Sequence, residues 1–413
     1  MSPPTKSPPP ATVWWSNAIF FVFIHVASVI GIYHRPPNLL PRATLFMSFL
    51  LWQAAEFGIT IGYHRLYAHR AFRAGFSVRL LLAILGSSAF QGSIKWWCVC
   101  LRHRLHHRFT DDPLHDPYAA TRGLLYSHMG WIFFKPKYDR LNSVDRDDLE
   151  NDSVVRFQHK YYVPLALFFG LVLPTLLGIL WDDPLGSFIW GGLVTTVAVW
   201  HCTFLVNSLA HWDGLQPYTD ENTSRGNLLL ALLTGGEGNH NFVSNTNSHA
   251  FPHDYRSGPS TLEWDPSKWI ILVLHYLGLV KGLRRAREED IVDAKEYMQH
   301  KHHDHVAGKK DDPSWNGPEW KLTDLKEFML QERGRCLVVV DGFVIDVSAY
   351  MGEHPGGSTI LRAYSINLNE LALGDQQKQK WRDASWAFGG GLNNHSRGAV
   401  KRMREIRIAR LLE

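Results

Sequence analysis

Four long apolar runs constrain what this chain can fold into more than any other feature. They cover residues 13–33, 39–62, 161–181 and 185–209, and each is close to the roughly 20 residues that a helix needs to cross a bilayer. A short segment with two prolines joins the first two runs, and the turn Trp181-Asp-Asp-Pro joins the last two. We therefore predict two helical hairpins, which give four membrane-spanning helices.

The segment between the two hairpins, 63–159, carries about fourteen Lys and Arg residues. Positively charged loops tend to stay in the cytosol, so we place this segment and both chain termini there. Two shorter apolar stretches, 78–94 and 269–280, are predicted to be helices at the membrane edge, with buried helices of a soluble core as the alternative. Residues 1–12 are rich in proline and predict a disordered tail.

Charge and cysteine content exclude several other classes of protein. The net charge of +4 is too small to indicate nucleic-acid binding, and it favours a membrane surface or an anionic substrate. The four cysteines form neither a secreted disulfide pattern nor a CxxC zinc motif. The unusual number is the 22 histidines, so their placement becomes the main clue to function.

Many of the histidines gather in clusters close to the predicted spans. The first cluster, HRLYAH, contains His64 and His69, and the second, HRLHH, contains His103, His106 and His107. Helix positions i, i+3 and i+4 share one face, so the three histidines of the second cluster should converge on one place. Those of the first cluster lie about 140° apart on an α-helix and should point at neighbouring targets. This arrangement suits two metal ions.

The third cluster contains His240 and His249, and Asn207 with His211 forms a further i, i+4 pair at the end of the last span. A lone histidine on an apolar face is usually a satisfied core residue, but this many at one membrane face favour metal binding. Imidazole binds iron, zinc and copper alike. Because no thiolate accompanies the histidines, redox iron fits better than structural zinc.

These motifs resemble the three histidine boxes of membrane fatty acyl desaturases. The segments HRLYAH, HRLHHRFTDDPLHDPY, RGLLYSHMGW, NSLAHWDG and GEGNHNF are together similar to the acyl-CoA Δ9 branch of that family. Acyl-lipid desaturases and alkane hydroxylases remain alternatives with different first and second boxes. The resemblance implies a di-iron centre in which Asn207 holds a metal-bound water and the ligands are His64, His69, His103, His106, His107, His211, His240 and His249.

The third box departs from the family pattern His-x-x-His-His. Here His240 is followed by Asn-Phe, then by the polar stretch 243–248, and only then by His249. Three explanations stay open. The stretch could come from a misassigned exon boundary, it could be real with His249 or His253 completing the site, or the protein could have lost full activity.

An acyl-CoA combines an apolar tail with an anionic head. We therefore expect an apolar tunnel with basic residues at its cytosolic mouth. No side-chain acid or base can break the C–H bond of an unactivated methylene, so a metal cofactor must supply that chemistry. Loop Lys and Arg residues are more often solvated, and Trp is common at membrane interfaces. The candidates for substrate binding are Trp96, Trp97, Arg102, Arg122, Trp131, Lys135 and Lys137.

The last hundred residues predict a separate soluble domain. Residues 336–347 indicate a β-hairpin turning at Asp341-Gly342, and an HPGG motif follows at His354. Two histidines on opposed helices can occupy both axial positions of a haem, which then transfers electrons only. Residues 320–412 resemble cytochrome b5, and this resemblance implies haem b with His354 and His395 as its axial ligands.

The two halves predict one enzyme with its own electron donor. The expected fold is an all-α integral membrane domain, with four transmembrane helices and a cytosolic helical cap that carries the histidine boxes, followed by a small α+β cytochrome b5-like domain. The predicted boundaries are a tail at 1–12, a membrane domain at 13–283, a linker at 284–319 and the haem-binding domain at 320–413. This order resembles fungal acyl-CoA Δ9 (stearoyl-CoA) desaturases.

The resemblance implies that the protein introduces a cis-Δ9 double bond into palmitoyl- or stearoyl-CoA. O2 would be the oxidant, and NADH-cytochrome b5 reductase would supply electrons through the fused haem domain. A flexible tether would keep this donor at an effective concentration on the order of millimolar. The expected location is the endoplasmic reticulum membrane with the active site in the cytosol. The alternatives are a lipid hydroxylase, a desaturase of other regiochemistry, and an impaired or non-catalytic haem-binding homologue.

Overall fold

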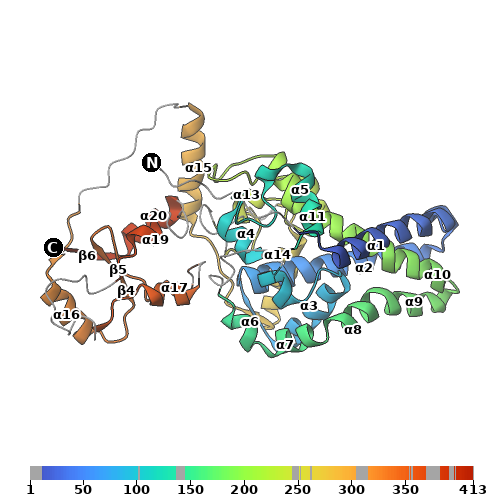
Figure 1. Cartoon of the computed structure of the whole chain (residues 1–413), viewed down its shortest axis with the longest axis horizontal. Helices are drawn as coiled ribbons and strands as arrows, with labels where there is room; N and C mark the ends of the chain where they lie inside the picture. Colours follow the sequence, from blue (N-terminus) through green and yellow to red (C-terminus); the bar gives the residue numbers. More distant parts are fainter. Residues whose placement is uncertain are drawn as a thin grey trace.

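A computed structural model describes residues 12–412 except 101–102, 136–144, 244–250, 252, 261–262, 304–314, 353, 355–356, 369–381, 390–394 and 396. The described chain has three parts (Figure 1). A bundle of long helices extends to the right of the view, a helical cap occupies the centre, and a small domain with a β-sheet lies on the left. The predicted combination of an all-α membrane domain with an α+β C-terminal domain is confirmed.

Within the described residues, four helices are long and apolar enough to span a membrane. They are Trp15–His34, Arg42–Ala68, Tyr162–Trp181 and Pro184–Trp212, which confirms the four predicted runs to within a few residues at most ends. In three of them, short stretches are π-helical or 3-10-helical instead of α-helical. Their elements are α1 (Trp15–His34), α2 (Arg42–Phe57), η2 (Gly58–Ala68), α8 (Tyr162–Leu167), η7 (Phe168–Val172), α9 (Leu173–Gly178), η8 (Ile179–Trp181), α10 (Pro184–Ser187), η9 (Phe188–Val194) and α11 (Thr195–Trp212).

The two hairpins are tied together at the end of the bundle farthest from the cap. The side chain of Asp183 accepts a hydrogen bond from the Gly186 amide at 3.1 Å and so caps α10. Its other oxygen accepts from the Thr44 hydroxyl at 2.7 Å. The indole N–H of Trp181 also donates to Thr44 at 2.8 Å. A buried carboxylate with several donors therefore connects the two hairpins where each chain reverses.

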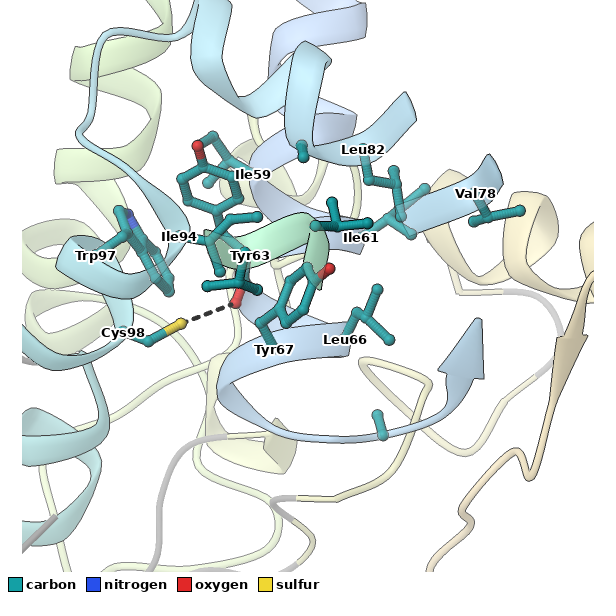
Figure 2. Packing of buried hydrophobic residues seen from close by; sticks show 14 of the residues in the cluster. Ile59, Ile61, Tyr63, Leu66, Tyr67, Val78, Leu82, Ile94, Trp97 and Cys98 are labelled. Carbon is teal, nitrogen blue, oxygen red and sulfur yellow. Dashed lines mark hydrogen bonds between the residues drawn. The ribbon is translucent and has the colours of Figure 1, made fainter. Parts of the chain in front are cut away.

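The cap is built around the π-helical end of the second span. Figure 2 shows Ile61 of this segment next to Leu82 of α3 (Phe76–Ser88), and Tyr63 and Leu66 belong to the same buried cluster. The two helices approach so closely that a Cβ on Gly58 would lie 2.3 Å from the backbone nitrogen of Gly86. Glycine is required there because any side chain would push the helices apart.

The remaining cap elements surround this core. The predicted helices at 78–94 and 269–280 are present as α3 and α14. Each exposes apolar side chains on one face, such as Leu81 and Val273, as a helix lying along a membrane would. The cap elements are β1 (Arg73–Ala74), η3 (Trp96–Cys100), α4 (His103–Phe109), η4 (Ala120–Arg122), α5 (Leu124–His128), η5 (Gly130–Phe133), α6 (Asp147–Asn151), α7 (Ser153–Lys160), α12 (Leu228–Leu233), α13 (His240–Val243), α14 (Pro266–Tyr276) and β2 (Val280–Lys281), with β1 antiparallel to β2.

The predicted solvated linker contains a helix, α15 (Glu288–His303). Ile291 and Met298 are buried on one of its faces, seven residues apart, which is the spacing of an apolar stripe on a helix. Ile291 packs in a cluster with Tyr218 and Phe242 of the cap. The many charged residues of this segment made the apolar stripe hard to recognise in the sequence. Because α15 packs on the cap, the first half of the linker is better described as part of the cap.

The C-terminal domain is a four-stranded sheet with helices on both faces. Its strand order is β3-β6-β5-β4, and the predicted hairpin turns at Asp341 and Gly342, both with positive φ. Residues of β4 alternate between the two cores, with Leu337 on one side and Val338 on the other. The elements are β3 (Glu319–Trp320), α16 (Leu322–Gln331), β4 (Leu337–Val340), β5 (Phe343–Asp346), α17 (Ser358–Ala363), α19 (Ser385–Phe388), α20 (Arg397–Glu405) and β6 (Arg407–Leu411).

Candidate active site

Seven buried histidines form two groups in the cap. Within each group, one ligand atom from every member lies within 4.8 Å of the others. In the first group, the Nε2 atoms of His64 and His69 are 2.9 Å apart and those of His103 and His107 are 2.6 Å apart. The first group contains His64, His69, His103 and His107, and the second contains His106, His211 and His240.

His64 and His69 point into the same group, and the prediction that they face neighbouring targets is wrong. That prediction assumed the 3.6 residues per turn of an α-helix. The segment is instead a π-helix, in which the amide of His69 donates to the carbonyl of His64 at 2.9 Å. A π-helical bond joins residues five apart and stacks them on one face.

The three histidines of HRLHH divide between the two groups, so the expectation that they converge on one place is also wrong. On α4, His103 and His107 are four residues apart and lie about 40° apart around the axis. His106 is about 100° from His107 and faces the second group. One short helix therefore supplies ligands to both groups, which places the groups side by side. The ring centroids of His106 and His107 are only 5.3 Å apart.

Side-chain oxygen atoms lie beside Nδ1 of three of these histidine rings. Nδ1 of His106 lies 2.8 Å from Asp116, Nδ1 of His211 lies 2.8 Å from the Thr223 hydroxyl, and Nδ1 of His64 lies 3.3 Å from Glu237. An acceptor at Nδ1 fixes the proton there and leaves Nε2 available to a metal. Sequence analysis missed these partners. The acidic residues inside HDPY and GEGNH were the signals that could have indicated two of them.

Burial favours the neutral form of three of the grouped histidines. It lowers the pKa of His103, His107 and His240 well below the ordinary value, and the neighbouring histidines lower it further. Neutral imidazole is the form that binds a metal. Within the described residues, neither ring nitrogen of His240 has a hydrogen-bond partner, which is costly for a buried polar group unless it binds a ligand. A donor set of buried neutral imidazoles fits iron.

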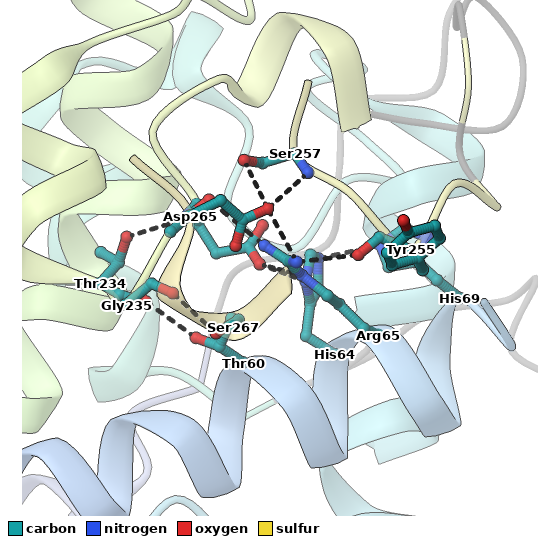
Figure 3. A network of polar contacts seen from close by, with 12 residues as sticks. Thr60, His64, Arg65, His69, Thr234, Gly235, Tyr255, Ser257, Asp265 and Ser267 are labelled. Carbon is teal, nitrogen blue, oxygen red and sulfur yellow. Dashed lines mark hydrogen bonds and ion pairs between the residues drawn. The ribbon is translucent and has the colours of Figure 1, made fainter. Parts of the chain in front are cut away.

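A buried arginine, Arg65, stabilises the backbone next to the first histidine group through ion pairs. Arg65 donates through Nε to Glu237 at 2.9 Å and through Nη1 to Asp265 at 3.0 Å. Nη1 also donates to the carbonyl of Tyr255 at 2.9 Å. Figure 3 shows Asp265 and Tyr255 around Arg65, beside His64. The Arg65 side chain is 1% exposed. Since Arg65 directly follows His64, the ion pairs fix the backbone that carries a ligand.

An apolar pocket opens beside the first histidine group. His64 and His103 are on its wall, and so is Asn207, the predicted holder of a metal-bound water. The pocket also contains Glu56, which sequence analysis missed although a single acidic residue inside an apolar span is a signal of function. The predicted tunnel residues Trp96, Trp97 and Trp131 all line this pocket.

The two predicted basic residues that the structure describes are not brought to the pocket. Arg122 is exposed, and its guanidinium lies 3.6 Å from the centre of the Tyr126 ring. Lys135 is exposed as well. Neither lines the pocket. Arg102, Lys137 and His249 lie outside the described residues, so their roles stay predictions.

The C-terminal domain brings His354 and His395 face to face. Their ring centroids are 6.5 Å apart, with an angle of 25° between the ring planes. Nδ1 of His354 lies 3.1 Å from the carbonyl of Gly357, and Nδ1 of His395 lies 2.8 Å from the carbonyl of Phe388. Each Nδ1–H can therefore donate to the backbone while Nε2 remains for a haem iron, so the pair fits bis-histidine ligation. Both residues lie outside the helices, contrary to the expectation of opposed helices.

Comparison with known proteins agrees with this geometry. The family model for fatty acid desaturases matches residues 37–241, and the model for the cytochrome b5-like heme/steroid binding domain matches residues 321–365. The probable acyl-CoA desaturase of Schizosaccharomyces pombe is 35% identical over 398 residues, which cover 96% of this chain and 77% of the relative. The chain belongs to the fatty acid desaturase family.

Other relatives of this desaturase differ in how much of the chain they match. Acyl-CoA desaturase 1 of Saccharomyces cerevisiae is 36% identical and covers 96% of this chain and 74% of the relative. Human stearoyl-CoA desaturase 5 is 34% identical, covering 66% of this chain and 81% of the relative. The two fungal relatives therefore align with nearly the whole desaturase. Di-iron and haem are the cofactors of these two families, and the histidine groups and the His354–His395 pair have the geometry to hold them.

The third histidine box of this desaturase supplies His240 to the second group. His253, one of the residues considered for completing the box, lies elsewhere: its Nδ1 is 2.5 Å from the carbonyl of His69, and it belongs to neither group. The second group thus has three histidines within the described residues, against four in the first. Residues 244–250, which hold the altered stretch and His249, are outside the described residues.

We expect the Asp116→Asn variant of this desaturase to lose activity and iron affinity by about 10- to 100-fold, the usual effect of removing a partner that orients a metal ligand. Asp116 is buried and holds His106 through a charged acceptor that asparagine lacks. Metal analysis and turnover would measure the loss. The matched control is Asp112→Asn, which affects His115, a residue of neither group. Equal losses in both variants would contradict the orienting role.

Proposed function

We propose that this protein is an acyl-CoA Δ9 desaturase that introduces a cis double bond into palmitoyl- or stearoyl-CoA. The observation that carries the proposal is a pair of adjacent buried histidine groups, the first of which places His64 and His103 on the wall of an apolar pocket, in a chain with four helices long and apolar enough to span a membrane. Iron bound at the histidine groups would supply the O2-dependent oxidation of the methylene carbons. Electrons would come from NADH-cytochrome b5 reductase through the haem domain.

We infer the ligands from the two groups. His64, His69, His103 and His107 would hold one iron, and His106, His211 and His240 would hold the other, with His249 as the predicted fourth ligand. Asn207 would bind through water, as its place on the pocket wall supports. His354 and His395 would hold haem b.

The side chains of the pocket would place and enclose the acyl chain. Trp97 is buried and contacts the His103 ring at 4.3 Å between centroids, so an acyl chain against this indole would lie next to the first group. Apolar walls exclude water, which protects the reaction from side products. The anionic CoA head would bind basic residues of the cytosolic face, for which Arg102, Arg122, Lys135 and Lys137 are the candidates.

The boundaries and the compartment complete the proposal. We place the tail at 1–12, the desaturase domain at 13–283, the linker at 284–319 and the haem domain at 320–413, with α15 of the linker packed on the cap. The protein would reside in the endoplasmic reticulum membrane, with both termini and the histidine groups in the cytosol.

Expression in cells that lack their own Δ9 desaturase tests the function. The chain as it stands is compared with a variant in which residues 243–248 are replaced by a single histidine, and gas chromatography measures the fatty acids. Palmitoleate and oleate from the unaltered chain would support the proposal and show that the altered third box is functional. Double bonds at another position, or hydroxylated products, would replace it with one of the alternatives.

The variant separates a wrong assignment from an inactive chain. Product from the variant alone would mean that the family function is right and that the stretch at 243–248 blocks it. Product from neither, with iron and haem both bound, would overturn the Δ9 assignment. A vector without insert and a His103→Ala chain provide the baseline.

A further inference from the structure

We propose that the haem domain docks on the cap with the His354 loop against Asp145, and that electrons enter the desaturase domain at this contact. The inference rests on the proposed function, because it names the route by which the haem domain would serve the histidine groups. In Figure 1 the C-terminal domain lies on the side of the cap opposite the membrane helices, with α15 and α20 between them.

An ion-pair network fastens the haem domain to the cap. Arg397, at the start of α20, donates through Nη2 to Asp220 at 2.8 Å and through Nε to Glu221 at 3.1 Å. Its guanidinium also lies 3.3 Å from the centre of the Tyr297 ring on α15. A single exposed ion pair contributes little, but a network in which one arginine has several partners can hold a defined geometry.

The same helix makes a second set of contacts with α15. Lys401 lies 3.7 Å from Asp290 and is in closer contact with Asp293. Arg287, directly before α15, donates to Glu405 of α20 at 3.0 Å, so in this pair the positive charge is on the side of α15. Charges of both signs thus alternate across the interface, which fixes the register of α20 along α15.

The loop that carries the haem ligand touches the cap directly. Arg284 donates through Nη2 to the carbonyl of Gly352 at 3.1 Å. At Gly357, a Cβ would lie 2.5 Å from the Cβ of Asp145, so the Asp145 side chain packs directly against the backbone of Gly357. The carbonyl of Gly357 is also the partner of the His354 ring. The haem ligand is therefore one hydrogen bond away from the residue that meets the cap.

From Asp145 a short route leads to the first histidine group. Its carbonyl accepts from Arg104 Nη1 at 2.6 Å, and its carboxylate lies 3.4 Å from Arg70 Nη2. Arg104 directly follows His103, and Arg70 directly follows His69. Covalent and hydrogen-bonded segments thus connect the haem loop to two members of the group.

Electrons would cross this contact one at a time, two for each double bond. The reductase restores the haem domain after each transfer. O2 takes up the two electrons, two protons and the two hydrogens removed from the acyl chain and leaves as two waters, so the reaction balances. The role given to Arg397 and Lys401 is positioning, since neither touches a cofactor or the substrate.

Zero-length carbodiimide cross-linking of the intact protein in detergent tests the docked arrangement. Peptide mass spectrometry should find Lys401 joined to Asp290 or Asp293, with the yield falling as salt increases because exposed ion pairs are screened. Absence of this cross-link at low salt would overturn the proposal. The readout does not depend on desaturation, so it is informative even if the Δ9 assignment fails.

Rapid-mixing measurements test the electron route. The reduced protein is mixed with acyl-CoA and O2, and reoxidation is followed in the haem absorbance. The Arg397→Glu variant should reoxidise about tenfold more slowly, as expected for reversal of an interfacial charge. Combining it with Asp220→Arg and Glu221→Arg should restore most of the rate. The matched control is Arg333→Glu, an exposed arginine of the same domain, which should behave like the parent.

Each result decides one point. A full haem spectrum in the Arg397→Glu variant shows that the domain is folded, so slow reoxidation then reports docking. An unchanged rate in that variant, or no recovery on charge exchange, would overturn the electron route. If instead the parent haem reoxidises at a rate independent of acyl-CoA while the cross-link still forms, the proposed function fails and the docking stands.

Discussion

Replacement of His240 by alanine is expected to abolish desaturation and to leave the second histidine group unable to hold its iron. His240 is buried, and within the described residues both of its ring nitrogens lack a hydrogen-bond partner, so ligation is the role that fits its environment. The group has only two other histidines in the described chain. Loss of one ligand from a group of three leaves too few donors to hold the ion against water.

Iron analysis together with the haem spectrum measures this prediction. The non-haem iron content should fall while the haem absorbance stays at the parent level, because the two sites lie in different domains. His115→Ala is the matched control, since His115 lies in the same cap but in neither group, and it should retain iron and activity. Full iron occupancy in the His240→Ala protein would show that His240 is not a ligand.

Replacement of Arg65 by alanine should destabilise the protein by about 3–5 kcal/mol, the usual cost of removing one partner from a buried ion pair. Asp265 is fully buried and Glu237 nearly so, and both would lose the guanidinium that compensates their charge. At present Arg65 and His64 together keep the pKa of Glu237 well below its ordinary value in spite of burial, which raises it. Glu237 should therefore also hold the His64 ring less firmly.

Denaturant unfolding in detergent micelles measures this effect. Arg65→Lys keeps the positive charge but lacks the planar guanidinium that reaches two carboxylates. Its free energy of unfolding should therefore lie between those of the parent and Arg65→Ala. The control is Arg146→Ala, an exposed arginine 3.6 Å from Glu150, whose removal should cost less than about 1 kcal/mol. If Arg65→Ala unfolds like the control, the buried network does not stabilise the cap.

Most residues of the site could be predicted because they occur in short sequence motifs. A span needs about 20 apolar residues whatever surrounds it, so the four runs could be found without coordinates. Histidines cluster within a few residues of one another in the sequence, so all seven histidines of the two groups could be predicted, although the side chains that contact them could not. The Asp341-Gly342 hairpin follows from a turn that requires positive φ at both positions.

The grouping of the ligands could not be predicted from spacing. HRLYAH was interpreted with α-helical geometry, and only the π-helical turns in the structure place His64 and His69 in one group. The widening of a helix depends on how neighbouring helices pack against it, as α3 does here at Gly58. The spacing of residues in the sequence does not indicate that packing.

The sequence by itself determined that this protein crosses a membrane, carries histidines for two metal ions and ends in a haem-binding domain, because each of these depends on residues close together in the chain. Only the tertiary structure decided which histidines lie in the same group, that Glu237 and Asp265 compensate Arg65 from about 170 and 200 residues away, and that Asp145 meets the His354 loop. Those contacts arise from packing between distant segments, and their partners are chosen by the fold as a whole.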